Sequence, residues 1–62
     1  MNYQTALKEA TKKFEDTNKN VYIFEVRKLN NYNFPDFVIS NRDSIIITSD
    51  SVAEIVKKFI KK

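Results

Sequence analysis

The sequence predicts one α+β domain with the order α-β-β-β-α, in which two helices pack on one face of a three-stranded antiparallel meander. Its 62 residues suffice for a single domain, 1–62. Near both ends of the chain, apolar residues recur every three or four positions, which is the spacing of amphipathic helices. Between them lie segments rich in β-branched and aromatic residues, which favour strands.

The first expected element is a helix that begins after Asn2, a suitable N-cap, and ends between residues 15 and 17. Its apolar stripe is formed by Tyr3, Ala6, Leu7, Ala10 and Phe14. The polar, turn-forming residues 16–20 then end the helix.

Three strands are expected next. Residues 21–29 are apolar on both faces at first and alternate only after Phe24. Residues 30–35 are expected to form a loop, because Pro35 cannot donate a ladder hydrogen bond. Residues 36–40 and 44–48 are predicted to form a hairpin through a short polar connection.

The last expected element is a second helix over residues 51–60. Ser51 and Glu54 fit a capping box, in which each side chain satisfies a free backbone N–H of the first turn. Apolar residues follow at helical spacing, and lysines crowd the last turns, where the helix dipole favours cations. The stripe is Val52, Ile55, Val56, Phe59 and Ile60.

Two helices cover only one face of a sheet, and this sheet is apolar on both. The core is predicted to contain Phe24, Val26, Phe37, Ile39, Ile45 and Ile47. We then expect Ile23, Val38 and Ile46 to line up on the open face as a protein-binding surface, for a second copy or for another protein. A second copy could instead bind through an unpaired edge strand. The alternative is that they are ordinary scattered surface aliphatics. Ile46→Lys is expected to leave the fold intact and abolish association.

A second candidate lies in the expected loop over residues 30–35, where Tyr32 and Phe34 stand among asparagines. Aromatic side chains in such a setting are typical of binding loops. The alternative is that Phe34 packs under the sheet edge while Tyr32 covers it.

Composition argues against catalysis. The chain has no histidine, cysteine or glycine, so it lacks the commonest general base and metal ligand, thiolate chemistry and phosphate-binding loops. Its acidic residues show no calcium-loop spacing. We expect no enzyme activity, cofactor, metal or small-molecule substrate.

The net charge of +3 permits a nucleic-acid partner without requiring one. If the helix ends converge, their lysines could follow a phosphate backbone. These are Lys8, Lys12, Lys13, Lys19, Lys57, Lys58, Lys61 and Lys62. The alternative is that they are solvated surface residues and partners of a helix dipole.

The expected α-β-β-β-α order resembles that of the double-stranded-RNA-binding domain, and residues 33–39 look like the start of that family's second strand. The family contacts phosphates through a lysine-rich start of its second helix, after a glycine-containing turn. Here the corresponding residues 49–54 are acidic and lack glycine, so no RNA-binding residue is carried over.

No apolar run reaches the length of a membrane span, and the first ten residues lack a signal-peptide pattern. We expect a cytoplasmic protein without a membrane partner. Residues with AT-rich codons are abundant, which suggests the genome of a low-GC bacterium, its phage or an archaeal virus. One expectation is a small phage or mobile-element protein that binds and modulates a host protein.

Overall fold

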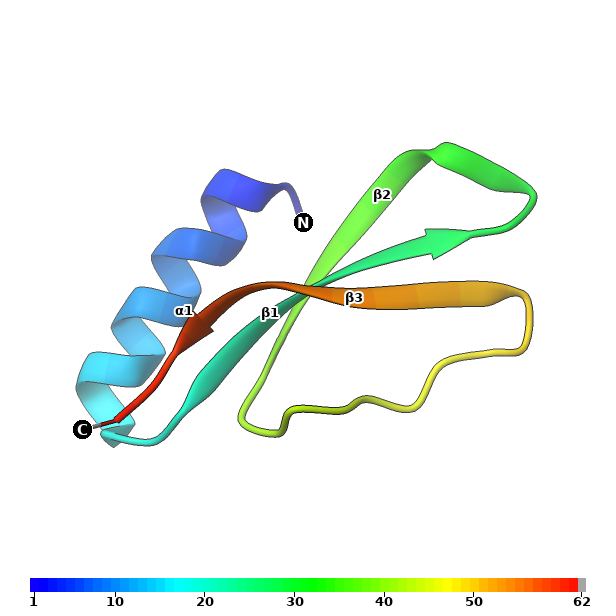
Figure 1. Ribbon diagram of the computed structural model, residues 1–62. Helices are drawn as coiled ribbons and strands as arrows, with labels where there is room; N and C mark the ends of the chain where they lie inside the picture. The colour runs from blue at the N-terminus through cyan, green and yellow to red at the C-terminus, as the bar shows by residue number, and fades with distance from the viewer. Residues whose placement is uncertain (62) are drawn as a thin grey trace.

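The computed structural model describes residues 1–61, apart from the side chains of Asn31 and Tyr32. The described residues form one helix and a three-stranded antiparallel sheet, so the chain is a small α+β domain. The elements are α1 (Tyr3–Thr17), β1 (Val21–Lys28), β2 (Asn31–Ser40) and β3 (Ser51–Phe59). β1 is the central strand, with β2 and β3 at its two sides (Figure 1).

The first helix is confirmed with both of its ends. The Asn2 side chain accepts a hydrogen bond from the Thr5 N–H at 2.8 Å, as an N-cap does. At the other end Asn18 takes a left-handed conformation, with φ 55°, and its N–H donates to the Phe14 carbonyl at 2.9 Å. In a chain without glycine, asparagine is the residue that enters this conformation most readily.

This C-cap gives a first prediction. Asn18→Ala is expected to lower the free energy of unfolding by about 1 kcal/mol. The Cβ of alanine disfavours positive φ, and alanine lacks the polar side chain with which asparagine offsets that cost through a local hydrogen bond. Asn18→Gly is expected to match or exceed the wild type. Urea denaturation followed by circular dichroism measures both variants. A loss of stability in the glycine variant would contradict this account of the cap.

One face of the sheet packs against α1. Ala6 and Ala10 of the helix meet Val21 and Ile23 of β1, and all four are fully buried. The alanines are small, so the helix lies close to the central strand. Half-buried side chains from α1, β2 and β3 surround this cluster. They are Leu7, Phe14, Phe37, Ile39 and Phe59.

The segment that connects β2 to β3, residues 41–50, runs on the other side of the strands from α1 (Figure 1). Phe24 is only 4% exposed yet lies outside the α1 cluster, as strand alternation from Ile23 requires. The connecting segment starts beside one end of β1, where the Asn41 amide donates to the Asn20 carbonyl at 2.9 Å. It ends beside the other, where the Leu29 N–H donates to the Asp50 carbonyl at 2.8 Å.

The predicted second helix is wrong, because residues 51–59 form strand β3. The apparent capping box belongs to a β-turn, in which the Ser51 N–H donates to the Thr48 carbonyl at 3.1 Å. The Thr48 hydroxyl donates to the Asp50 carboxylate in this turn, and that bond lowers the pKa of Asp50. The part of the chain that the structure describes contains one helix, so the resemblance to the double-stranded-RNA-binding domain in element order also fails.

The predicted meander and hairpin are wrong as well. The sheet order is β2-β1-β3, and β2 already starts at Asn31, so most of the expected loop is strand. Residues 44–48, expected as a strand, lie in the connecting segment. In a meander the third strand would pair with β2. Here β3 pairs instead with the edge of β1 that β2 leaves free.

The predicted core is therefore only partly correct. β2 pairs with β1 so that Ile39 lies opposite Ile23 on the α1 face, while Phe24 lies opposite Val38 on the other face. Phe24 is buried, and Phe37 and Ile39 are half-buried beside the α1 cluster. Outside that cluster, Val26 and Ile45 are half-buried and Ile47 is exposed.

The molecule is long and thin for its size. Its Cα atoms extend over 37 × 21 × 13 Å, with a radius of gyration of 11.9 Å. A compact domain of this length has a radius of gyration of about 10.6 Å. The strands extend beyond the helix on the side of the β1–β2 turn, which leaves that half of the sheet without a helical cover (Figure 1).

Candidate protein-interaction surface

The three aliphatic residues predicted to form one surface lie in three different places. Ile23 is fully buried under α1, so its predicted exposure is wrong. Val38 lies on β2, on the face away from α1, and is partly exposed. Ile46 is fully exposed in the connecting segment. The sequence-predicted patch is not formed.

The two aromatic candidates are also separated from that set. Phe34 is 74% exposed and lies on β2 rather than in a loop. It lines a shallow hollow with Val26, Lys28 and Asp36 near the β1–β2 turn. The side chain of Tyr32 lies outside the described residues.

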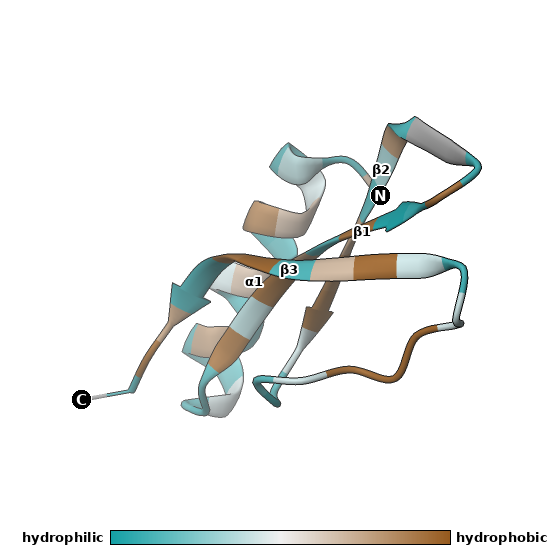
Figure 2. Cartoon of the chain, turned by 45° about the vertical axis from the view of Figure 1, so that its right-hand side comes forward, coloured by the Kyte–Doolittle hydropathy of each residue, from teal (hydrophilic) through white to brown (hydrophobic). Residues whose placement is uncertain are grey.

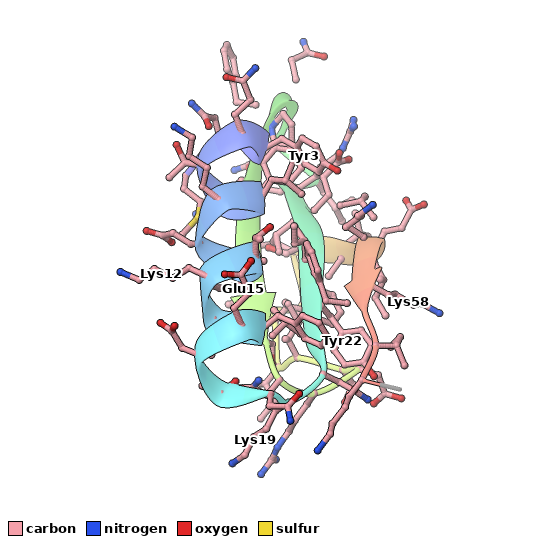
Figure 3. The ribbon with its side chains drawn as sticks, turned by 90° about the vertical axis from the view of Figure 1, so that its left-hand side faces the viewer. Tyr3, Lys12, Glu15, Lys19, Tyr22 and Lys58 are labelled. Carbon is pink, nitrogen blue, oxygen red and sulfur yellow. The ribbon has the colours of Figure 1, made fainter. Side chains whose placement is uncertain are left out.

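The described lysines do not form one continuous group, although the Lys61 N–H donates to the Asn20 side chain at 2.7 Å, which places Lys61 near Lys19. Lys8, Lys12 and Lys13 are on α1, whereas Lys57 and Lys58 are on β3. Figure 3 shows Lys12 and Lys58 pointing away from opposite sides of the molecule, with Lys19 at one end. Lys61 is exposed after β3, and Lys62 lies outside the described residues. Lys12 and Lys58 therefore do not lie on one continuous phosphate-binding track, and only the Lys19 and Lys61 regions are brought together among the described lysines.

The two edges of the sheet differ in their protection. At the β2 edge, the Phe37 N–H donates to the Met1 carbonyl at 3.3 Å, so the N-terminal residue covers part of the strand. The Met1 amino group also forms an ion pair with the Asp36 carboxylate. Pro35, in the middle of the strand, has no N–H to offer. These are the features by which proteins keep edge strands from pairing.

The Met1–Asp36 contact predicts a pH dependence. The hydrogen bond from the amino group holds the pKa of Asp36 below its usual value. In the unfolded chain the pKa of an aspartate is about 4. Because the folded-state pKa of Asp36 is lower, the ion pair stabilises the fold above that pH, and the stabilisation is lost as pH falls through the folded-state pKa. Between about pH 5 and about pH 2 the wild type should lose more stability than Asp36→Asn. Urea midpoints across this range test it, and parallel curves would contradict it.

The β3 edge has no proline and is not covered by the N-terminal residue; its own protective features are the bulge at Val56 and the charges of Lys57 and Lys58. β3 is the outer strand of the sheet, and α1 packs mainly over β1 and β2. Figure 3 shows β3 as the outermost strand, on the other side of β1 from the helix. Three large aliphatic side chains are exposed along the strand and its end. These are Val52, Val56 and Ile60. Figure 2 shows hydrophobic segments along β3.

Charged residues of both signs interrupt this apolar strand. Glu54 lies opposite Glu25 of β1, and the Arg27 side chain donates to the Glu25 carboxylate. Lys57 lies opposite Ile23, and its ammonium is 6.0 Å from the Phe59 ring centre. The pairing shifts by one residue between Ile23 and Phe24, which leaves one extra residue, a β-bulge, at Val56.

No protein-family model, curated protein or solved structure matches the chain. Within residues 1–61, no helix has both the length and the apolar character needed to cross a membrane.

The exposed residues of β3 were missed as a site because the sequence places them in the buried stripe of a helix. A signal for the strand is present. Val52, Ile55 and Val56 are β-branched, which favours strands. Residues 51–55 also alternate between half-buried and exposed, as one strand with one covered face does. Helical and strand periods overlap over such a short segment, so the spacing alone does not decide between them.

Proposed function

We propose that the chain is a non-enzymatic protein-interaction module that binds an extended segment of a protein partner by strand addition at the β3 edge. In this binding mode, a peptide adds one strand to an exposed sheet edge. Backbone hydrogen bonds supply much of the affinity, and alternate side chains supply the specificity.

The observation that supports this proposal is the difference between the two edges. The β2 edge is covered by Met1 and interrupted by Pro35, whereas β3 is a nine-residue strand that pairs on one side only. The bulge at Val56 and the charges of Lys57 and Lys58 limit non-specific pairing at this edge, so a partner strand has to match them. The exposed valines along β3 add apolar area that a bound strand would cover.

Selection of random displayed peptides on the immobilised chain tests the proposal. Peptides that bind should be strand-forming sequences, and their addition to isotope-labelled protein should shift the amide resonances of β3 more than those of β2. The reason is that new hydrogen bonds form only at the open edge. Selected peptides that shift resonances elsewhere, or no enrichment of any peptide on a chain that is monomeric, would contradict it.

Two exposed valines provide a matched pair of variants. Val56 on β3 and Val38 on β2 are 38% and 36% exposed, so a lysine costs a similar amount of burial at either site. Val56→Lys is expected to weaken binding of a selected peptide by about tenfold or more, because it places a charge within the covered strand. Val38→Lys is expected to leave binding unchanged. Circular dichroism confirms that both variants are folded.

A further inference from the structure

We propose that the partner strand at this edge is β3 of a second copy of the chain, which gives a symmetric dimer with a continuous six-stranded sheet. This inference rests on the proposed function and names its partner. Two copies of an edge strand can pair only antiparallel if a two-fold axis relates them and the sheet is to continue. Such an axis runs perpendicular to the sheet, so it keeps the α1 face of one copy beside the α1 face of the other.

The axis restricts which residues can lie opposite one another, because directly opposed side chains share a face. Glu54 is opposite Glu25, and Lys57 is opposite Ile23. Because Ile23 is in the α1 cluster and Glu25 lies two residues further along β1, both belong to the α1 face. Glu54 and Lys57 therefore share that face, although residues three apart in a regular strand lie on opposite faces. The extra residue of the bulge at Val56 shifts the alternation of side chains by one position, which brings Glu54 and Lys57 to the same face.

This geometry selects one register, with the two-fold axis between Ile55 and Val56. Glu54 of each copy then lies opposite Lys57 of the other, which gives two oppositely charged pairs. Val52 lies opposite Phe59 in the same register, again on the α1 face, because their β1 partners are Arg27 and Val21. Charged pairs and apolar pairs at such positions both stabilise a sheet.

Neighbouring registers are less favourable. An axis through Glu54 places two carboxylates directly opposite each other, and an axis through Lys57 does the same with two ammonium groups. Like charges in directly opposed positions are destabilising. Glu54 already lies beside Glu25 within its own sheet, so a lysine from the second copy would offset that repulsion.

The exposed area is also large for a monomer. The chain exposes 4762 Å², whereas a compact monomer of 7.3 kDa exposes about 4,200 Å². The excess of about 560 Å² is smaller than, but of the same order as, the roughly 800 Å² that each partner buries in an ordinary stable interface.

Two charge reversals test the register. Glu54→Lys and Lys57→Glu each turn both attractive pairs of the dimer into repulsive ones, so each variant alone should dimerise roughly ten- to thirtyfold more weakly than the wild type. In an equimolar mixture, the lysine introduced in one variant would lie opposite the glutamate introduced in the other, and the unchanged Lys57 and Glu54 would form the second attractive pair. The mixture should therefore recover the affinity of the wild type. Sedimentation equilibrium from micromolar to millimolar concentration measures all four samples, and circular dichroism confirms folding.

Lys12→Glu is the matched control, since it makes the same change of charge on α1, where Lys12 points away from the sheet (Figure 3), and it should leave dimerisation unchanged. A wild-type dimer that neither reversal weakens, or single variants whose mixture stays monomeric, would overturn the register. A wild type that stays monomeric but binds selected peptides at β3 would overturn the dimer and leave the proposed function in place. A monomer that binds no peptide would overturn both.

Discussion

Ile23→Lys is expected to leave the chain unfolded, whereas Ile46→Lys should be as stable as the wild type to within about 0.5 kcal/mol. Ile23 is fully buried among Ala6, Ala10 and Val21, so a lysine there would bring an unpaired charge into the apolar cluster under α1. A domain of this length has a free energy of unfolding of only about 3–9 kcal/mol, which the cost of that charge can exceed. Ile46 is fully exposed in the connecting segment.

Far-ultraviolet circular dichroism and thermal denaturation of the two variants measure this difference. The pair carries the same substitution on the same residue type, so only the environment differs. A folded Ile23→Lys variant would mean that Ile23 is not in the core. Ile46→Lys should also dimerise as the wild type does, because Ile46 lies outside β3; loss of association in that variant would favour the connecting segment as the binding surface.

The parts of the fold that the sequence predicted correctly are those with strong local signals. The helix α1 combines a regular apolar stripe with an N-cap at Asn2 and a stop near Asn18. The strand β1 is rich in β-branched and aromatic residues, and its apolar start on both faces fits a central strand that is covered on both sides. Neither element needs a distant residue to be recognised.

The errors concern segments whose structure depends on which edge of β1 is free. Residues 44–48 have a higher β-propensity than residues 51–59, yet they lie in the connecting segment while the latter form β3. Pairing with β1 decides the outcome, and pairing is a property of the whole fold rather than of either segment. The exposure of Ile23 was predicted wrongly for the same reason, since it followed from an assumed register between the first two strands.

The candidate site at the β3 edge could not be predicted from the sequence, because it also depends on how β3 pairs with β1. That Glu54 and Lys57 share a face follows from the bulge at Val56, which appears only in the pairing of β3 with β1. The sequence shows the two charges and the valines but not their arrangement. An edge strand with both charges on one face is therefore a finding of the structure.

Phe24→Ala is expected to cost about 3–5 kcal/mol, which is most of the stability of so small a domain. Phe24 is 4% exposed on the face away from α1, and the connecting segment runs on that side of the strands (Figure 1). Removing its ring would leave a cavity under a segment without helix or strand structure. Phe34→Ala is the matched control, because Phe34 is 74% exposed and its loss should change stability by less than about 0.5 kcal/mol. Urea denaturation of both variants measures the difference.

A milder variant shows whether Phe24 holds the connecting segment in place. Phe24→Leu keeps an apolar side chain of smaller volume, so the domain should stay folded while the segment loosens. The Leu29 N–H donates to the Asp50 carbonyl at the end of that segment and is a direct reporter of its attachment. Its hydrogen exchange should accelerate more than that of the Asn18 N–H, which donates within the C-cap of α1. Equal acceleration at both amides would show a general loss of stability and would mean that Phe24 does not anchor the segment.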